Sequence, residues 1–507
     1  MDRGAWEPLT DELVRRRAKS QAMGGTERTA REHEAGRLNA RQRLRALCDQ
    51  GSFIELWGLA GLEEPGGGIA ADGFPCGHGL IAGRPAAVGA EDFTSKGGSI
   101  GTPGGTKRER LARLAGDERM PLVVVLHGAG ARAAKALDRY IPHPHDLGAI
   151  ADLAGVVPTV AVVAGPSAGH GALTAALSDL VVMVRGRGAL FTAGPQLVQN
   201  SIGETTDPES LGGADVHAVR SGIAHVAVDT EEEALAAARR YLSYLPSSSW
   251  EQPPLAGAEG GADVGLRPTP RILELLPPDA RKAYDIRPVL DELVDAGSRF
   301  ELQPDHGPSI ITAFARIGGH AVAIVANQPS ARAGAVDAAA ARKAARFIEV
   351  ASSFHLPLVF LADNPGVMAG SASEEAGILR AAGRMFAAQH RCPTPKIHVT
   401  LRKAFGFGTS IMGLNQFDGR TFAFALPGVT LGVMPARGSA DVAKVGPDAR
   451  AALERSEAGG PWKLASEAAY DDVIHPAELR DTLVRTLHLA DRPGREARPV
   501  ARLGYLP

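Results

Sequence analysis

Residues 162–179 read VVAGPSAGHGALTAALSD, and a glycine turn joins the two halves of this stretch. The β-branched run VVPTVAVVA that leads into it, residues 156–164, predicts a buried strand, and the alanine-rich residues after the turn predict a helix. Gly165-Pro166-Ser167-Ala168-Gly169 also matches G-x-S-x-G, the nucleophile elbow that exposes a serine between a strand and a helix. Two interpretations follow: either Ser167 is a nucleophile, or the backbone of the turn carries the chemistry.

A second glycine turn lies upstream, where MPLVVVLHGAG, residues 120–130, runs from another buried strand into a turn. Its HGAG residues, 127–130, are close to the HGGG-type oxyanion motif of esterases. A helix is expected after this turn, over Ala131–Tyr140. Another helix is expected before it, because Thr106 and Glu109 form a Thr-x-x-Glu capping box. Strands that alternate with helices in this way favour an α/β fold with parallel strands.

The same order of strands and turns returns in the second half of the chain. LPLVFLADNPG, residues 356–366, resembles MPLVVVLHGAG, and PKIHVTLRKAFGFGTSIMG, residues 395–413, resembles PTVAVVAGPSAGHGALT. Gly165 then pairs with Gly406, at an offset of roughly 240 residues. The segment Pro246–Arg271 is rich in Pro, Gly and Ser and reads as a linker. We therefore predict two α/β domains, residues 1–255 and 256–507.

The composition is that of an ordinary globular protein. Hydrophobic residues make up 44% and charged residues 22% of the 507-residue chain, and the formal net charge is −2. The chain as a whole therefore has no excess of positive charge that would attract nucleic acid or a membrane surface. The three cysteines lie far apart, which argues against a disulfide framework or a structural zinc site. With no secretory signal and no apolar run of about 20 residues, the expectation is a cytoplasmic protein.

The glycine turns themselves suggest a chemistry. The first amides of a helix lack intrahelical acceptors and lie at its positive dipole end, so such turns can hold an oxyanion. Gly130-Ala131 and Gly169-His170 are expected to form one such hole, and Gly366-Val367 and Phe407-Gly408 a second. His170 is interpreted as a helix-start residue that offers its backbone N–H, with a role as a base or ligand as the alternative.

The serine interpretation requires an acid and a histidine after Ser167, and Asp363 and His398 are candidates without a distinctive context. The matching turn of the second copy, KAFGFGTS, has no nucleophile, so analogous work by the two turns does not need a serine. A serine esterase remains an alternative. Asp179 is expected to be structural. The basic residues that flank the turns are expected to be mostly solvated, with one or two able to meet a phosphate; they are Lys107, Arg108, Arg132, Arg402 and Lys403.

Nearly the whole chain resembles the carboxyltransferase (β) subunits of biotin-dependent acyl-CoA carboxylases. The pieces that carry this resemblance occur in order and include ERTAREHEAGRLNARQRL, EDFTSKGGSIG, GPSAGHGALTAALSDLVVMV, ARKAARFIEVASSFHLPLVFLADNPGVMAG and RKAFGFGTSIMG. The resemblance implies two tandem crotonase-like (ClpP/crotonase) domains, each with parallel β-sheet layers and helices. It assigns the acyl-CoA side to residues 1–255 and the biotin side to residues 256–507.

In this family, carboxybiotin on a carrier protein gives its CO2 to the α-carbon of an acyl-CoA, and no catalytic side chain or metal is needed. Carried over, the amides of Gly169 and His170 would hold the thioester oxygen, and those of Phe407 and Gly408 the ureido oxygen of biotin. The substrate-binding residues implied are Gly130, Ala131, Gly366, Val367 and Ser410. The active site would lie between the first domain of one subunit and the second domain of another, in a homo-hexamer.

The chain has no Met-Lys-Met biotin-attachment motif and no evident ATP-binding loop, so a biotin carboxylase and a biotin carrier are expected as partner chains. The alternatives within and outside the fold are a biotin-dependent decarboxylase subunit and a non-catalytic scaffold. Three departures from the family leave the acyl-CoA open. His127 replaces the Asp of the Asp-Ser-Gly-Gly-Ala-Arg turn, Phe407 stands in place of a small residue, and Ser410 replaces an aspartate associated with acyl-chain choice.

Overall fold

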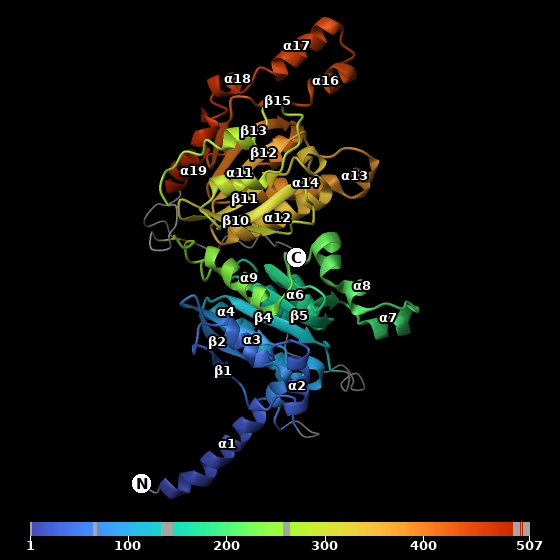
Figure 1. Ribbon diagram of the computed structural model, residues 1–507, viewed down its shortest axis with the longest axis vertical. Helices are drawn as coiled ribbons and strands as arrows, with labels where there is room; N and C mark the ends of the chain where they lie inside the picture. The colour runs from blue at the N-terminus through green and yellow to red at the C-terminus, as the bar shows by residue number, and fades with distance from the viewer. Residues whose placement is uncertain are drawn as a thin grey trace. The chain divides into compact units, whose positions relative to one another are not determined.

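The computed structural model describes residues 3–63, 68–132, 146–256 and 264–489, together with residues 497 and 499 (Figure 1). The chain forms two compact units, the first ending at Ser243 and the second beginning at Tyr244. This division lies just before the segment Pro246–Arg271. Most of the helix expected over Ala131–Tyr140 lies outside the described residues.

The first unit contains a mixed sheet of eight strands among its described residues. The order across the sheet is β1-β2-β3-β4-β5-β6-β8, and β7 pairs with β5. The first three strands pair antiparallel, and the rest pair in parallel. The strands are β1 Ile54–Leu56, β2 Cys76–Ile81, β3 Arg84–Ala90, β4 Leu122–Gly128, β5 Thr159–Ala168, β6 Leu180–Val184, β7 Ala189–Phe191 and β8 Val226–Val228.

Helices cover this sheet and protrude from it (Figure 1). They are α1 Glu7–Gln21, α2 Thr26–Glu34, α3 Ala40–Leu47, α4 Thr102–Asp117, α5 Asp146–Ala151, α6 His170–Leu177, α7 Pro195–Ile202, α8 Pro208–Gly212 and α9 Glu231–Tyr244. The capping box predicted at Thr106 is wrong, because α4 already begins at Thr102, with a proline in its first turn. Thr106 Oγ1 donates to the Thr102 carbonyl one turn earlier, so its hydroxyl caps nothing.

The second unit repeats this plan. Its sheet has the order β9-β10-β11-β12-β13-β14-β16, and β15 pairs with β13. The strands are β9 Phe300–Leu302, β10 Ile310–Ile317, β11 His320–Asn327, β12 Leu358–Asn364, β13 Lys396–Phe405, β14 Thr421–Ala425, β15 Thr430–Gly432 and β16 Asp472–Val473. The helices are α10 Ile272–Leu275, α11 Arg287–Leu293, α12 Ala338–Ser353, α13 Ser371–Glu375, α14 Ile378–Arg391, α15 Gly406–Ile411, α16 Ala436–Ala443, α17 Pro447–Glu457, α18 Trp462–Ser466 and α19 Leu479–His488.

The repeat fixes which residues correspond. Gly169 directly precedes α6, and Gly406, 237 residues later, is the first residue of α15. Both glycines have φ near +55°, which L-residues rarely adopt. The predicted pairing of Gly165 with Gly406 is therefore wrong by four residues. Strands β5 and β13 each contain a register shift before their last residues, and this irregularity moves the turn away from the position that strand patterns suggest.

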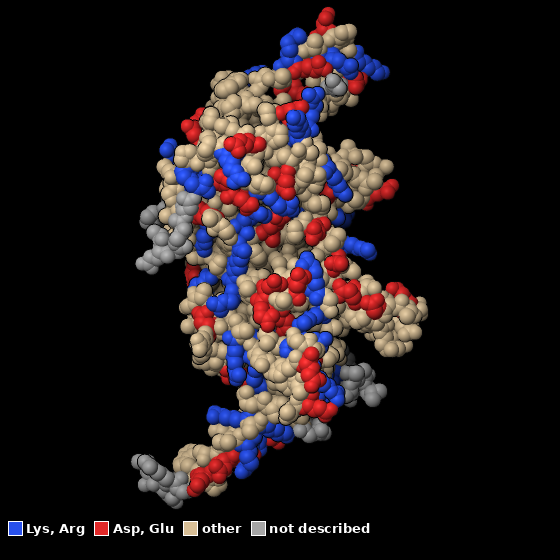
Figure 2. Space-filling model, in the orientation of Figure 1, with Lys and Arg blue, Asp and Glu red and all other residues tan. Residues whose placement is uncertain are grey.

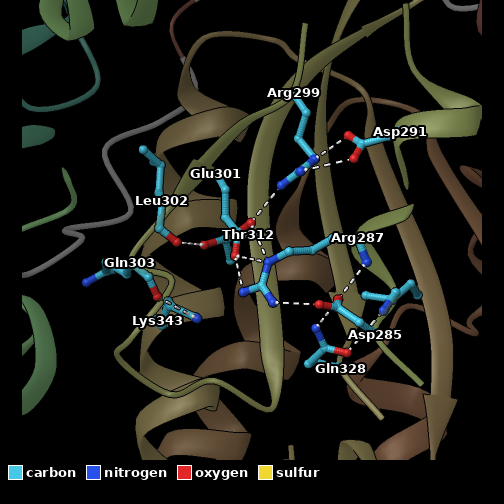
Figure 3. A network of polar contacts seen from close by, with 11 residues as sticks. Asp285, Arg287, Asp291, Arg299, Glu301, Leu302, Gln303, Thr312, Gln328 and Lys343 are labelled. Atoms are coloured by element: carbon cyan, nitrogen blue, oxygen red, sulfur yellow. Dashed lines mark hydrogen bonds and ion pairs between the residues drawn. The ribbon is translucent and has the colours of Figure 1, made fainter. Parts of the chain in front are cut away.

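A network of polar contacts links several side chains of the second unit (Figure 3). In the second unit, Glu301 of β9 accepts hydrogen bonds from Arg287 and Arg299, both at 2.8 Å. Lys343 of α12 donates to the Gln303 carbonyl at 3.1 Å, and burial lowers the pKa of its amine to about 7. Lys107 of α4 is its counterpart, donating to a backbone carbonyl at 3.0 Å with a pKa that burial also lowers.

Lysine, arginine, aspartate and glutamate are interspersed over the face drawn in Figure 2, without a broad region of one sign. Among the described residues, no helix is long and apolar enough to cross a membrane.

Candidate active site

The turn between β5 and α6 offers one unengaged amide. Gly169 precedes the helix with φ +55° and ψ −106°, and its N–H donates to the Phe191 carbonyl of β7 at 2.9 Å. His170 is the first residue of α6, where intrahelical acceptors are lacking. Among the described residues, its N–H has no acceptor. Of the two amides expected to hold the thioester oxygen, only that of His170 is unengaged in this structure.

The turn after β4 adds two more amides. Ile100 donates to the Gly130 carbonyl at 2.8 Å, and Arg132 donates to the Ile100 carbonyl at 3.1 Å, which fixes the turn on both sides. The N–H groups of Gly130 and Ala131 have no acceptor within the described ranges. Gly130 lies so close to the end of β5 that a Cβ on it would come within 2.6 Å of the Ala168 carbonyl oxygen. The two turns are therefore in direct contact.

The second unit builds the same pair of turns. Gly366 donates to Asn364 Oδ1 at 3.0 Å, and Val367 pairs with Val336 as Ala131 pairs with Ile100. A Cβ on Gly408 would lie 2.3 Å from Asn364 Oδ1, so only glycine lets α15 approach the first turn this closely. The amides of Val367, Phe407 and Gly408 have no acceptor in the part of the chain that is described.

Side chains from α14 and β13 support α15. Gln389 donates its amide to the Ser410 carbonyl at 3.2 Å and is itself fully buried. Lys396 donates to the Gln389 carbonyl at 3.2 Å and forms an ion pair with Asp418. Burial alone would raise the pKa of the Asp418 carboxyl, but the hydrogen bond from Lys396 and the neighbouring amides leave it below its ordinary value.

Ser167 is not at the apex of a turn. It lies within β5, opposite Gly128 of β4, and its side chain is fully buried. Its Oγ has no hydrogen-bond partner among the described residues. Asp363 is engaged by Arg402 at 2.7 Å, and His398 bonds to Thr400 and the Met412 carbonyl. The elbow interpretation fails because an elbow needs an exposed serine next to a base.

His127 is a structural residue. Its ring stacks on Phe93 with centroids 4.3 Å apart, and its Nδ1 faces the Arg43 guanidinium at 3.4 Å. Burial, reinforced by Arg43, lowers the pKa of the imidazole to about 2, so the ring stays neutral. A neutral ring thus occupies the position that Asp363 holds in the second unit.

The flanking basic residues are mostly buried and paired, contrary to the expectation that they are solvated. Arg108 pairs with Glu91, Arg132 with Asp72, and Arg402 with Asp363, each at 2.7 Å. Lys403 lies 3.8 Å from Asp363, and Lys107 donates to a backbone carbonyl. Asp179 accepts from the Thr159 amide at 3.0 Å, a structural contact. Because these five basic side chains are engaged, the unengaged backbone amides of the turns are better candidates than they are for meeting an anion.

The side-chain partner of His170 could not be predicted from the sequence. Nε2 of His170 lies 2.8 Å from both carboxylate oxygens of Asp146, the first residue of α5. The Asp146 side chain is 2% exposed, whereas the His170 side chain is 30% exposed. Asp146 follows a stretch with no recognisable motif, so nothing in the sequence linked it to His170. The described residues contain no group of three or more His, Cys, Asp or Glu side chains that could hold a metal ion.

Comparison with known proteins gives a consistent picture. The carboxyl transferase domain family model matches residues 31–502. The chain is 33% identical to the methylmalonyl-CoA carboxyltransferase 12S subunit of Propionibacterium freudenreichii subsp. shermanii, covering 99% of this chain and 97% of that protein. It is 33% identical to the carboxyltransferase subunit of propionyl-CoA carboxylase from Haloferax mediterranei, covering 99% of each. It is 34% identical to the methylmalonyl-CoA decarboxylase subunit alpha of Veillonella parvula, covering 97% of each.

Solved structures agree with these relatives. The crystal structure of transcarboxylase 12S, described as a hexamer assembly with methylmalonyl-coenzyme A bound, superposes with a TM-score of 0.90 at 32% identity and covers 99% of each chain. The two α/β units therefore have the fold of that enzyme core.

Proposed function

Because the chain belongs to the carboxyl transferase domain family, we propose that it is the carboxyltransferase subunit of a biotin-dependent acyl-CoA carboxylase. It transfers CO2 from carboxybiotin, a substrate delivered by a carrier protein, to the α-carbon of an acyl-CoA. The observation that carries this proposal is the repetition, in both units, of two touching glycine turns, each of which presents at least one amide without an acceptor among the described residues.

In the first unit, we assign the thioester oxygen to the His170 amide together with an amide of the Gly130-Ala131 turn. This assignment replaces Gly169, whose amide already donates to Phe191. In the second unit, the amides of Phe407 and Gly408 receive the ureido oxygen of biotin, with Gly366, Val367 and Ser410 lining the same turns. Each hole donates to an oxygen that becomes negative only during reaction, so its hydrogen bonds strengthen in the transition state.

A biotin carboxylase and a biotin carrier protein are the proposed partners, because the proposed reaction takes its CO2 from carboxybiotin, which they would make and deliver. A homo-hexamer is the proposed core, with each active site shared between the first unit of one subunit and the second unit of another. A cytoplasmic location belongs to the same proposal.

The second candidate is a biotin-dependent decarboxylase subunit, favoured by the 34% identity to the Veillonella parvula decarboxylase subunit. It would use the same two holes in the reverse direction. The two candidates differ in the direction that their partners drive: net carboxylation of an acyl-CoA on reconstitution with a biotin carboxylase, a biotin carrier and ATP supports the carboxylase. Failure of that carboxylation while biotin-dependent decarboxylation proceeds supports the decarboxylase.

The reverse half-reaction tests the proposal without partners. The purified chain is incubated with malonyl-CoA, methylmalonyl-CoA or a longer carboxyacyl-CoA, with and without free biotin, beside the Ser167→Ala variant. Biotin-dependent loss of the carboxyl group, unchanged in Ser167→Ala, is the expected result and identifies the preferred acyl chain. Biotin-independent hydrolysis of the thioester that Ser167→Ala abolishes would refute the proposal.

A further inference from the structure

The buried end of β12 carries an asparagine whose side chain contacts both turns of the second unit. Asn364 Oδ1 accepts the Gly366 N–H at 3.0 Å, which fixes the turn after β12. The same oxygen lies against the start of α15, because a Cβ on Gly408 would come within 2.3 Å of it. One side-chain oxygen therefore contacts both the turn that presents the Val367 amide and the helix that presents the Gly408 amide.

A second asparagine holds the first. Asn364 Nδ2 donates to Asn327 Oδ1 at 3.2 Å, and the same Oδ1 accepts the Asp363 N–H at 3.1 Å. Asn327 Nδ2 donates in turn to the Gly334 carbonyl at 3.1 Å. Both side chains are fully buried, and their backbone partners determine which end of each amide is oxygen and which is nitrogen. The two asparagines thus form a neutral pair of fixed orientation.

The first unit places a carboxylate where the second unit has this pair. Glu91, 236 positions before Asn327, accepts the His127 N–H at 2.6 Å and so holds the end of β4. The position of Asn364 is taken by Gly128, and a Cβ there would come within 2.8 Å of Glu91 Oε2. The carboxylate of the first unit therefore fills the space that the Asn364 side chain fills in the second.

The two units also differ in what neutralises a charge at this place. In the first unit, Arg108 of α4 pairs with Glu91 at 2.7 Å, and both side chains are almost fully buried. The residue of α12 at the same offset from Arg108 is Ala344, which is fully buried and has no charge. The ion pair of the first unit is thus replaced as a whole, at three positions together.

The charged groups that flank the asparagine pair already have partners. On β12 and β13, Asp363 pairs with Arg402 at 2.7 Å and lies 3.8 Å from Lys403. At the start of α12, Asp337 forms an ion pair with Arg332. A neutral pair suits this place, because a buried carboxylate without a cation of its own is costly.

We propose that Asn364 is the positioning residue of the biotin-side hole, with Asn327 as its support; this rests on the proposed function. By accepting the Gly366 N–H, Asn364 fixes the turn whose Val367 amide is unengaged among the described residues, and it holds this turn against α15. Because its side chain is neutral, it adds no fixed negative charge beside amides that are to meet an oxygen becoming negative.

The test uses the likeness of asparagine to protonated aspartic acid. In Asn364→Asp, the protonated side chain can still accept the Gly366 N–H and donate to Asn327. The ionised side chain cannot donate, and it brings a negative charge against Gly408. Asn364→Ala removes the amide without adding charge.

The control is Gln328→Glu, which also converts a buried amide of the second unit to a carboxylate. This amide binds Asp285 and the Ile286 backbone, not the two turns. Each full-length variant is assayed for decarboxylation of a carboxyacyl-CoA with free biotin between about pH 5 and pH 8, where a buried carboxyl can titrate. The kcat, the KM of each substrate and the thermal midpoint are measured beside wild type.

At about pH 8, Asn364→Asp is expected to lose about 100-fold in kcat/KM for biotin, as for loss of one oxyanion donor, with the KM for carboxyacyl-CoA unchanged. Relative to wild type, its activity should recover as the pH falls, because the carboxyl takes up a proton. Asn364→Ala should lose activity at every pH without this recovery. Gln328→Glu should follow wild type throughout.

Asn364→Asp that follows wild type at every pH overturns the inference and leaves the proposed function intact. So does a loss that pH does not change, or one that falls equally on both substrates. Wild type that decarboxylates no carboxyacyl-CoA in the presence of biotin overturns the proposed function as well. Should Asn364→Asp fail to fold, Asn364→Ala decides: a lower kcat/KM for biotin alone supports the inference, and any other result overturns it.

Discussion

A methyl group on Gly165 would lie 2.1 Å from Cδ2 of His127, and that ring cannot move aside. It is stacked on Phe93, faces Arg43, and its backbone amide is held by Glu91 at 2.6 Å. In the second unit, an Arg402–Asp363 ion pair occupies the corresponding positions. Gly165 and His127 therefore stand together where the second unit has this buried ion pair: glycine corresponds to Arg402, and the larger neutral histidine corresponds to Asp363.

We expect Gly165→Ala to lower the free energy of unfolding by about 1–3 kcal/mol, the usual range for overpacking. Urea unfolding of purified variants measures this. Gly105→Ala is the matched control, because a Cβ there has no atom within 4 Å and glycine in a helix interior costs stability. In a His127→Ala background, Gly165→Ala should cost clearly less. An equal cost in both backgrounds would show that the ring is not what excludes the methyl group.

Lys343 makes stability depend on pH in a defined direction. Its pKa is about 7 when folded, because of burial, against an ordinary value of 10.5. Between these values the unfolded chain binds a proton that the folded chain does not, so stability rises with pH across this window. The contribution is about 1.4 kcal/mol for each pH unit at most.

Comparison of wild type with Lys343→Met isolates this effect. The urea midpoint of wild type relative to the variant should rise from pH 7 to pH 10, and their difference should be constant below pH 7. Lys19→Met, at an exposed position on α1, serves as control and should run parallel to wild type throughout. If the difference in urea midpoint between Lys343→Met and wild type does not change with pH, Lys343 is protonated in the folded protein, and burial does not lower its pKa as assigned.

At the scale of elements, α15 depends on α14. Gln389 holds the Ser410 carbonyl from a fully buried position, so Gln389→Leu removes a support of the helix without touching the amides of Phe407 and Gly408. We expect a several-fold higher KM for free biotin in the reverse half-reaction, with the KM for carboxyacyl-CoA unchanged. Gln328→Leu is the control, because this buried amide binds Asp285 and the Ile286 backbone instead. Equal effects of the two variants on biotin would contradict the assignment of α15.

The amide of Phe407 can be removed alone. Proline is tolerated in the first turn of a helix, where its missing N–H breaks no helical bond. Phe407→Pro therefore deletes one donor of the second hole, whereas Phe407→Ala deletes only the half-exposed ring. We expect Phe407→Pro to slow biotin-dependent decarboxylation about 100-fold or more, as for loss of one oxyanion donor. Phe407→Ala should stay within about tenfold of wild type, and equal losses would show that the ring, not the amide, matters.

Features that depend on local interactions could be predicted from the sequence, whereas features that depend on contacts between distant residues could not. Apolar runs and glycine turns predicted two parallel α/β domains, because strand burial and positive φ are local properties of residues such as Gly169 and Gly406. The engagement of the Gly169 amide was not predictable, because it comes from β7, a strand of three residues that appears only through its pairing with β5. The contact of His170 with Asp146 likewise joins residues 24 positions apart without a motif.

At the scale of the whole molecule, the two units carry complementary halves of one proposed site. Each unit has its own sheet and its own pair of turns. The His170 amide belongs to the first unit, and the Phe407 amide belongs to the second. If each site is shared between subunits, a chain damaged in one unit can still lend its other unit to a neighbour. A closed symmetric assembly permits this exchange, because every interface is repeated.

Mixed assemblies test the sharing directly. His170→Pro removes a first-unit amide and Phe407→Pro a second-unit amide, so each homo-oligomer should be inactive in biotin-dependent decarboxylation. When the two variants are co-expressed with different tags and purified through both, each mixed pair contains one site built from two intact units, and activity should return. Mixing separately purified variants without subunit exchange is the control and should stay inactive. Doubly tagged assemblies that remain inactive would mean that each chain completes its own site, and the proposed sharing between subunits would be wrong.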